Sequence, residues 1–504
     1  MSERHFSIGR TLGKSLLLAG VALSGASCES AKPTTPVAQQ SQSPWSLETP
    51  TITNPSIQSP LPVELPSPTI TPAPDTTVIP EPSDAPESKV LSEVNTGVGS
   101  EPSIAVSPYD SSLMAVTHQR VAFSDGCNLS GLRISQDGGR TWSEVSKEPW
   151  QGECPDFHGQ VAFGPGPTPG SSRLWWVDAI ITGTHRISPG VTFSDDLGKT
   201  WAPLHIETRT PPWVGGFPDI TVDNNPQSPN FGTVYVAYNW LESEKGPGLA
   251  VIASGDNGNT WDMAQVPTVK LDGYPDYWRI GYRIKTAPDG SANVSFYQSM
   301  LRQWSSGDIF NQGGASNIGN LGFALAKIHR DPISGKLDVD EPQWMTSVAN
   351  NLNLPFDPEW QTGLDVDSKG QVWMAVSDNG RIDIGSTGMS AWRSFCLDGQ
   401  SCFKPSLAVK DNMVFVGFHG RDNNGMVRTY YMISYDDGRS FTEPQLVTPY
   451  AWSWSSMSGL TNNVGLRENA TAGVDNSGNP VFVYAFGVGR NGQPNVDVAV
   501  ISPQ

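Results

Sequence analysis

The sequence predicts an all-β fold, a β-propeller built from four-stranded antiparallel blades, and it does so through repeats at two levels. The pattern Ser-x-Asp-x-Gly-x-Thr-Trp occupies 135–142, 194–201 and 254–261, and a variant ending in Ser-Phe occupies 434–441. The first three copies start 59 and 60 residues apart, and the fourth starts 180 residues after the third. Such intervals are typical of propeller blades.

Each copy of the pattern is predicted to be a tight turn between two strands. In 132–142, an apolar strand runs into Asp and Gly, which tolerate turn geometry, and continues into a strand-favouring Thr-Trp pair. We expect Asp137 to accept backbone N–H groups within its turn, a Ser or Thr hydroxyl to close the turn, and Trp142 to pack between sheets. These aspartates and tryptophans are therefore interpreted as structural.

On these residues the chain resembles the sialidase-like β-propellers, whose Asp-box (BNR) repeats have this pattern. Four copies at near-constant spacing make the resemblance one of fold. Asp boxes also occur in propellers that hydrolyse nothing, so fold does not fix function.

A second repeat gives the number of blades. Seven units each contain a short strand, a turn and a second apolar strand: 101–106 with 113–117, 158–163 with 174–180, 217–222 with 234–238, 282–286 with 293–297, 363–366 with 372–376, 404–409 with 414–418, and 470–474 with 481–486. Four boxes at their own period fit six blades, but we favour seven. The last unit lacks an outer strand, so 90–94 is predicted to close the ring as an N-terminal strand.

Residues 1–28 have the pattern of a bacterial export signal. They combine basic residues, an apolar run and small residues before a cysteine: Arg4, Arg10, Lys14, 16–23 and Cys28. We expect lipidation at Cys28 and a place in the cell envelope or on the cell surface. Ordinary secretion and an uncleaved anchor are the alternatives.

Residues 29–89 are rich in Pro, Ser and Thr and cannot form a core. Proline fixes φ, so this segment is expected to be a disordered, semi-rigid tether of roughly 3 Å per residue. Residues 90–504 are then a single propeller domain, because each blade buries its faces against two neighbours.

The remaining cysteines fit an oxidising compartment. An even number after Cys28 predicts two disulfides, Cys127 with Cys154 and Cys396 with Cys402. Their spacing does not resemble a metal site, and we expect no metal and no cofactor.

Candidate site residues lie where the innermost strands begin, at the face opposite the Asp boxes. The polar ones are Glu101, Asp156, His158, Asp219, Arg279, Arg283, Glu359, Gln361, Lys404, Arg467 and Glu468. Aromatic residues able to stack on sugar rings are Trp150, Trp213, Tyr277, Trp278, Trp360, Trp452 and Trp454. About half of these residues are expected at any water-facing channel mouth.

Sialidase activity, as the resemblance implies it, needs three arginines, a tyrosine nucleophile partnered by a glutamate, and an acid/base aspartate. The arginines are Arg279, Arg283 and Arg467, with Arg120 and Arg421 as substitutes. The carboxylates are Glu101, Asp219, Glu359 and Glu468, and the tyrosine stays open among Tyr238, Tyr277, Tyr282 and Tyr484. The family's early Phe/Tyr-Arg-Ile-Pro motif is absent from the first blade.

The net charge of −18 narrows the partners. Nucleic acid and anionic lipid surfaces repel such a chain, so we expect no nucleic acid and membrane contact only through the lipid anchor. A carbohydrate, best a neutral one, or a surface protein fits the charge. The leading hypothesis is glycoside hydrolysis by paired carboxylates at the channel mouth, as in a sialidase-like exo-glycosidase. The alternative is a non-catalytic propeller for glycan binding, protein binding or assembly, and lyase chemistry stays open.

Overall fold

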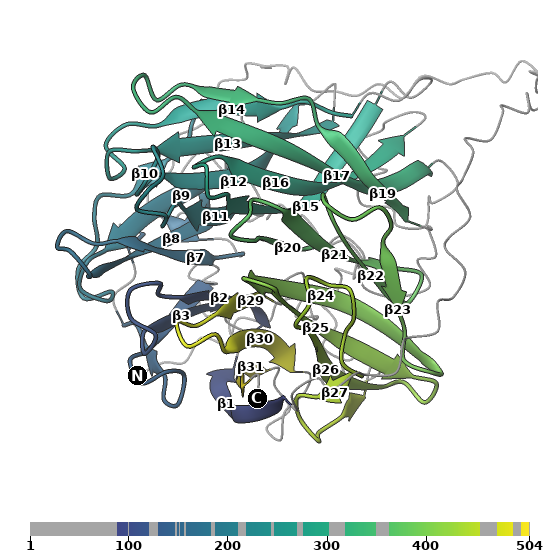
Figure 1. Ribbon diagram of the computed structural model, residues 1–504. Helices are drawn as coiled ribbons and strands as arrows, with labels where there is room; N and C mark the ends of the chain where they lie inside the picture. Colours follow the sequence, from purple (N-terminus) through teal and green to yellow (C-terminus); the bar gives the residue numbers. More distant parts are fainter. Residues whose placement is uncertain are drawn as a thin grey trace, which may run out of the picture. The chain divides into compact units, whose positions relative to one another are not determined.

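The computed structural model describes residues 88–98, 100–119, 130–146, 149–150, 152–155, 158–182, 187–209, 218–242, 246–269, 276–301, 318–348, 362–453, 471–486 and 495–502. Within these residues the regular elements are all β-strands, and they form seven antiparallel sheets. The sheets are the blades of a propeller, with β11 and β29 near the middle of the ring and β14 and β1 at its edge (Figure 1). The prediction of seven blades is confirmed, and the six-blade alternative is wrong.

The strands of the first four blades, given from the inside outward, are these. Blade 1 contains β2 (Ser100–Val106), β3 (Met114–Gln119), β4 (Ser130–Ser135) and β5 (Ser143–Glu144). Blade 2 contains β7 (Gln160–Pro165), β8 (Ser172–Ile181), β9 (Ile187–Ser194) and β10 (His205–Ile206), with β6 (Cys154–Pro155) also paired to β8. Blade 3 contains β11 (Asp219–Val222), β12 (Val234–Glu242), β13 (Gly246–Ser254) and β14 (Asp262–Val266). Blade 4 contains β15 (Asp276–Thr286), β16 (Ala292–Leu301), β17 (Ile318–Arg330) and β18 (Leu337–Val339), with β19 (Gln343–Val348) also paired to β17.

The last three blades repeat the plan. Blade 5 contains β20 (Thr362–Val366), β21 (Val372–Asp378), β22 (Arg381–Ser386) and β23 (Arg393–Phe395). Blade 6 contains β24 (Gln400–Lys410), β25 (Met413–Asp422), β26 (Met426–Ser434) and β27 (Gln445–Leu446), with β28 (Trp452–Ser453) also paired to β26. Blade 7 contains β29 (Thr471–Val474), β30 (Pro480–Phe486), β31 (Asn495–Ser502) and β1 (Lys89–Val98).

The N-terminal strand closes the ring, as predicted. β1 pairs antiparallel with β31, from Lys89 opposite Ser502 to Val98 opposite Asn495. The hydroxyl of Thr96 adds a 2.9 Å hydrogen bond to the carbonyl of Val496. This pairing covers the otherwise open edge of the last blade with a strand from the other end of the domain.

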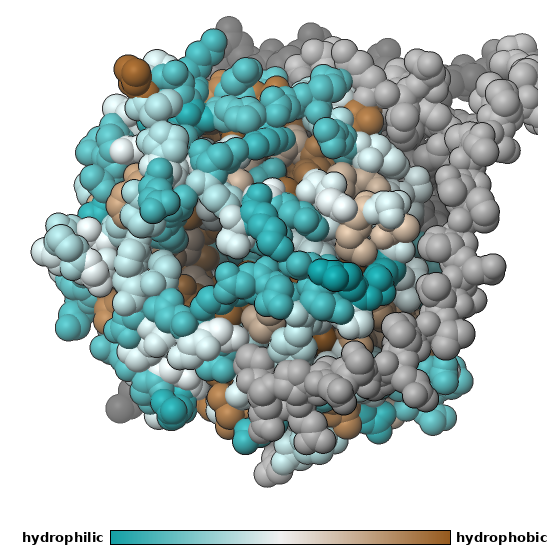
Figure 2. Space-filling view, in the orientation of Figure 1, coloured by the Kyte–Doolittle hydropathy of each residue, from teal (hydrophilic) through white to brown (hydrophobic). Residues whose placement is uncertain are grey.

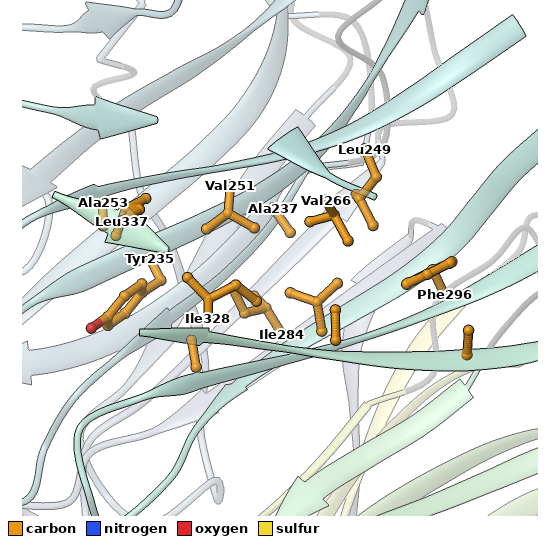
Figure 3. Packing of buried hydrophobic residues seen from close by; sticks show 14 residues of the cluster. Tyr235, Ala237, Leu249, Val251, Ala253, Val266, Ile284, Phe296, Ile328 and Leu337 are labelled. Carbon is orange, nitrogen blue, oxygen red and sulfur yellow. The ribbon is translucent and has the colours of Figure 1, made fainter. Parts of the chain in front are cut away.

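Neighbouring blades pack face to face through apolar side chains. Between blades 3 and 4, residues of β12, β13 and β14 meet residues of β15 to β18 (Figure 3). Tyr235, Val251 and Phe296 are among the members of this cluster that have no exposed surface. Strands whose two faces are both covered are apolar on both faces, which is why most second and third strands read as nearly continuous hydrophobic runs.

The Asp-box turns have the hydrogen bonds that the sequence predicts. In the first box, the Ser135 hydroxyl donates to Oδ1 of Asp137 (2.8 Å), and the Thr141 hydroxyl donates to Oδ2 (2.6 Å). The backbone N–H of Thr141 also donates to Oδ1 of Asp137 (2.9 Å), and the Trp142 indole donates to the carbonyl of Gly139 (3.1 Å). These bonds lower the pKa of Asp137 to about 2, the largest effect being that of the Thr141 hydroxyl.

The glycine at the fifth position of each box explains why the turns matter for the ring. A Cβ atom placed on this glycine would lie close to a side chain of another blade. The distances are 3.5 Å from Gly139 to Val500, 2.8 Å from Gly198 to Val145, 3.5 Å from Gly258 to Trp175 and 2.6 Å from Gly438 to Trp373. Each contacted residue belongs to the preceding blade. The box therefore brings its backbone against the neighbouring blade at a position that also needs a positive φ, and glycine meets both demands.

Candidate functional site

The innermost strands begin at one end of the channel, and the Asp-box turns lie at the other end, because successive strands of a blade alternate in direction. We call the end where β2, β7, β11, β15, β20, β24 and β29 begin the channel mouth. The face of the ring seen in Figure 2 is mostly hydrophilic and is hollowed near its middle, where brown hydrophobic surface shows between the blades.

The structure describes the side chains of part of the predicted site. Outside the described residues lie Cys28, Arg120, Cys127, Asp156, Glu359, Trp360, Gln361, Arg467 and Glu468. The structure describes only the backbone of three further candidates: Glu101 in β2, and Trp278 and Arg279 in β15. The candidate roles of all these residues stay predictions. Described with their side chains are His158, Asp219, Arg283 and Lys404.

Two of the predicted binding residues have strained backbones. His158 has a φ of 74° and Lys404 a φ of 53°. The other non-glycine residues with positive φ in the described chain lie in tight turns: Leu197, Asn257, Asn379, Asp411 and Asp437. His158 and Lys404 instead stand at the channel mouth, His158 just before β7 and Lys404 within β24. Such strain costs about 1–3 kcal/mol per residue and is concentrated at functional sites.

Lys404 occupies an irregularity of β24, where the pairing with β25 shifts between Phe403 and Ser406. Its backbone N–H donates to the Ser377 hydroxyl of blade 5 (3.1 Å), and its side chain is buried. Burial, together with the charge of Lys404, lowers the pKa of His419 to about 3. His419 is therefore a neutral imidazole at physiological pH, and its Nδ1 lies 3.1 Å from the Thr429 hydroxyl.

Asp219, a predicted catalytic acid, joins two blades. Its Oδ2 accepts a 2.8 Å hydrogen bond from the backbone N–H of Ile284, the residue after Arg283 on β15. Between blades 7 and 1 the hydroxyl of Thr471, likewise the first residue of its inner strand, accepts a 2.7 Å bond from the N–H of Ile104. A threonine cannot serve as an acid/base group at neutral pH. The first residue of an inner strand can therefore make this bond to the next blade without an ionisable side chain. The geometry supports a structural role for Asp219.

A polar cluster at the start of blade 2 was missed by the sequence analysis. A Cβ atom placed on Gly159 would lie 2.8 Å from Oδ2 of Asp178, 3.0 Å from Nε1 of Trp176 and 3.4 Å from Oγ of Ser130. Asp178 and Trp176 come from β8, and Ser130 begins β4 of blade 1. The backbone of Gly159 therefore packs closely against three buried polar side chains, and a side chain at position 159 would crowd them. The available signal was a lone aspartate in the apolar strand Trp175-Trp176-Val177-Asp178-Ala179.

The two candidate tyrosines whose side chains the structure describes are buried within the blades. Tyr238 and Tyr484, two of the four candidate nucleophiles, have no exposed surface. Burial raises the pKa of Tyr484 well above its ordinary value. The side chains of Tyr277 and Tyr282 lie outside the described set.

Two tryptophans that were predicted to stack on sugars belong to the core. Trp150 is buried and meets Trp176 edge to face, with ring centroids 4.6 Å apart. Trp452 is also buried, 6.4 Å from the ring of His419. The prediction of sugar stacking was wrong for both, because their strands and loops turn these side chains inward between blades.

The cysteines differ from the prediction at one pair. Cys396 and Cys402 are free thiols. The thiol of Cys396 donates to the carbonyl of Gln400 at 3.2 Å, and a hydrogen bond with Cys402 lowers the pKa of Cys396 to about 7. The predicted disulfide between Cys396 and Cys402 is therefore not formed. Cys154 is disulfide-bonded, and its predicted partner Cys127 lies outside the described residues, so that pairing stays a prediction.

The described residues contain no group of three or more His, Cys, Asp or Glu side chains placed to hold a metal ion. None of the described segments forms a helix with the length and apolarity that a membrane crossing needs.

Comparison with known proteins finds similarity to solved structures alone, at low sequence identity. No family model matches the sequence, and no curated protein matches it. Among solved structures, an ulvan lyase of a new polysaccharide lyase family is 10% identical, with 82% of this chain and 96% of that chain covered and a TM-score of 0.47. An α-L-arabinanase of Penicillium chrysogenum in complex with arabinobiose is 13% identical, with 70% and 99% covered and a TM-score of 0.44. A Hadza microbial sialidase is 12% identical, with 82% and 96% covered and a TM-score of 0.38.

Proposed function

We propose that this protein is a carbohydrate-active propeller that binds a glycan at the channel mouth. The observation that carries the proposal is the pair of buried, strained residues on the mouth side of two blades, His158 just before β7 and Lys404 within β24. A lysine or histidine gains nothing for folding from a left-handed backbone or from burial. Both costs make sense where the side chain must point a donor at a ligand.

The chemistry of the mouth suits a polyhydroxylated ligand. Lys404 brings three N–H donors, the guanidinium of Arg283 brings five, and the imidazole of His158 can donate and accept. Hydroxyl and ring oxygens of sugars accept from such groups without needing an opposite charge. A neutral glycan also fits a chain with a net charge of −18, which repels polyanions.

We further propose glycoside hydrolysis as the reaction, with Glu101, Glu359 and Glu468 as the carboxylates to test. A pair of carboxyl groups about 5–5.5 Å apart serves a retaining mechanism, and about 6.5–9.5 Å serves an inverting one. Display at the cell surface through a lipid on Cys28 and the tether of residues 29–89 belongs to the same proposal. A long spacer would hold the mouth away from the membrane, where extended polymers can reach it.

A non-catalytic glycan- or protein-binding propeller is the second candidate. The hydrogen bond from Ile284 to Asp219 favours it, because this bond commits one of the four nominated carboxylates to the scaffold.

The deciding experiment screens the purified full-length protein against chromogenic glycosides and natural glycans, with binding and cleavage followed in parallel. We expect binding that is lost in Lys404→Ala, with the melting temperature retained. Cleavage that disappears in Glu359→Gln or Glu101→Gln would identify the enzyme. Binding without cleavage would leave the second candidate, and no binding to any glycan would refute both carbohydrate roles.

A further inference from the structure

Cys396 and Cys402 stand on either side of one tight turn, where blade 5 passes into blade 6. The backbone N–H of Gln400 donates a 3.0 Å hydrogen bond to the carbonyl of Leu397, and Gly399 has a φ of 66°. Cys396 follows β23, the outermost strand of blade 5, and is exposed. Cys402 lies within β24, the innermost strand of blade 6, and is buried. The turn therefore joins a thiol that solvent reaches to a thiol that is covered by the protein.

The carbonyl group of Gly380 brings the two cysteines together. It accepts a 2.7 Å hydrogen bond from the backbone N–H of Cys402, and the Sγ atom of Cys396 lies 3.6 Å from the same oxygen. The Cys396 thiol also donates to the carbonyl of Gln400 at 3.2 Å, two residues before Cys402. A bond between the two sulfur atoms therefore needs movement of one short turn and no exchange of strands.

Arg381 favours the thiolate form of Cys396. Ile382 on β22 lies opposite Phe395 on β23. Arg381 and Cys396 are the next residues along this register, and Nε of Arg381 is buried with no hydrogen-bond partner in the part of the chain that the structure describes. A hydrogen bond with Cys402, followed by the charge of Arg381, lowers the pKa of Cys396 to about 7. The same hydrogen bond, together with burial, raises the pKa of Cys402. At neutral pH the exposed sulfur is the nucleophile, and the buried sulfur keeps its proton.

We propose that Cys396 and Cys402 form a thiol–disulfide exchange site for small disulfides, with Cys396 as the attacking thiol and Cys402 as the resolving thiol. The structure holds the reduced form of this pair, so the proposed reaction is reversible and differs from the permanent disulfide that the sequence predicts. Cys154 is disulfide-bonded in the same chain, which sets the two free thiols apart. This site is independent of the proposed glycan binding.

The reaction balances in two steps. The Cys396 thiolate attacks one sulfur of the small disulfide, whose S–S bond breaks; a mixed disulfide forms and one substrate thiolate leaves. Cys402 then attacks Sγ of Cys396, and its proton goes to the second substrate sulfur, which leaves as a thiol. The two cysteines are oxidised to one disulfide, and the small disulfide is reduced to two thiols. An excess of small thiol drives the same steps backwards.

The expected rate follows from the thiolate fraction of Cys396. At pH 7 about half of a thiol with a pKa of about 7 is ionised, against about 3% of a thiol with the ordinary pKa of about 8.5. A less basic thiolate is also a weaker nucleophile, by about fivefold here, so the net gain in rate is about threefold.

The experiment incubates the full-length protein with oxidised glutathione at pH 7, after treatment with a mild thiol reductant and desalting. Peptide mass mapping assigns each adduct and each disulfide to its cysteines. In the wild type, we expect Cys396 to react about threefold faster than an unperturbed cysteine peptide and to end in a disulfide with Cys402. In Cys402→Ala, glutathione should instead remain on Cys396. Cys402→Ser replaces this variant if Cys402→Ala folds poorly.

Arg381→Gln tests the effect of the charge. The pH midpoint for alkylation of Cys396 by iodoacetamide should be about 7 in the wild type and should rise toward about 8.5 in Arg381→Gln. Arg393→Gln is the matched control, because it removes the same charge from β23, where Arg393 lies opposite Ile384. It should leave the midpoint unchanged.

Three outcomes would overturn the proposal. If both thiols of the folded wild type stay free in oxidised glutathione but react after unfolding, there is no exchange site. If glutathione stays on Cys396 in the wild type, Cys402 does not resolve the mixed disulfide. If a disulfide between Cys396 and Cys402 forms and then resists the reductant in the folded protein, the reaction is not reversible. Glycan binding enters none of these readouts, so failure of this site leaves the proposed function standing.

Discussion

The hydroxyl group of Tyr484 donates a 2.6 Å hydrogen bond to Oε1 of Glu93, joining residues 391 positions apart in the chain. Tyr484 lies on β30 of the last blade, and Glu93 lies on the N-terminal strand that closes it. A tyrosine partnered by a glutamate is what sialidase-like catalysis would require, but this phenol is buried. Burial, followed by the charges of Asp497 and Glu93, raises its pKa well above the ordinary value, which opposes nucleophilic attack. The pair instead ties the two ends of the ring together.

Removing that hydroxyl is therefore expected to weaken ring closure. Tyr484→Phe should lower the free energy of unfolding by about 1.5–3 kcal/mol, the net value of a hydrogen bond to a charged acceptor. Denaturant titration of the full-length protein measures this. Tyr450→Phe is the control, because Tyr450 is 57% exposed and should change stability little. Equal stability losses in the two variants would contradict a role for the Tyr484–Glu93 bond.

Asp497 makes the closure sensitive to pH. Burial and the charge of Glu93 raise the pKa of Asp497 from an ordinary 3.8 to about 7. The folded state then holds this proton more tightly than the unfolded state does. The contribution of the protonated Asp497 carboxyl group to the free energy of unfolding is fully present below about pH 4. It is lost as the pH rises through about 7, at a rate of no more than about 1.4 kcal/mol per pH unit.

Asp497→Asn should remove this contribution. We expect the stability of the wild type to fall relative to the variant between about pH 4 and pH 7, as followed by denaturant titration at several pH values. Asp338→Asn changes an exposed residue and is the control. Its free energy of unfolding should change with pH in the same way as that of the wild type. Parallel curves for Asp497→Asn as well would mean that Asp497 is ionised throughout.

The structural reading of Asp219 gives a prediction that separates scaffold from catalysis. Asp219→Asn keeps an acceptor for the Ile284 N–H and should leave both melting temperature and any glycan cleavage near wild type. Asp219→Ala leaves that buried N–H without a partner and should cost about 1–3 kcal/mol. Loss of cleavage in Asp219→Asn at a normal melting temperature would return Asp219 to the catalytic candidates.

The fold was predictable because it is periodic. Seven pairs of apolar strands and the four boxes repeat along the chain, and each repeat must solve the same packing problem. The closing strand was predictable from the missing outer strand of the last blade, although β1 extends from Lys89 to Val98, beyond the predicted 90–94.

The site was harder to predict because its contacts join residues that are remote in sequence. Gly159 meets Ser130 from one blade and Asp178 from another strand, and no local pattern encodes that meeting. Asp219 has the residue type of an acid, but its role depends on a backbone N–H of the next blade. Cys396 and Cys402 are close in sequence, yet both are free thiols, which their spacing alone does not reveal.

The Asp boxes should matter for stability and not for ligand binding. In the second box Asp196 accepts hydrogen bonds from the Ser194 hydroxyl (2.9 Å) and from the hydroxyl and N–H of Thr200 (2.7 and 2.8 Å). Asp196→Ala should therefore lower the melting temperature clearly, while Lys199→Ala at the exposed neighbouring position should not. A normal melting temperature with lost glycan binding in Asp196→Ala would contradict the structural reading of the boxes.

Lys404 offers a test of whether the strain at the mouth serves function. Glycine adopts a φ of 53° without penalty, so Lys404→Gly should keep or raise the melting temperature while it removes the ammonium group and the glycan affinity. Asp411→Gly is the matched control, because Asp411 has a φ of 54° in the turn between β24 and β25 and should gain up to about 1 kcal/mol in stability without changing binding. Thermal melting and glycan titration of both variants measure the two effects separately. If Lys404→Gly binds as well as the wild type, the strain at Lys404 has no role in ligand recognition and the proposed site loses its main support.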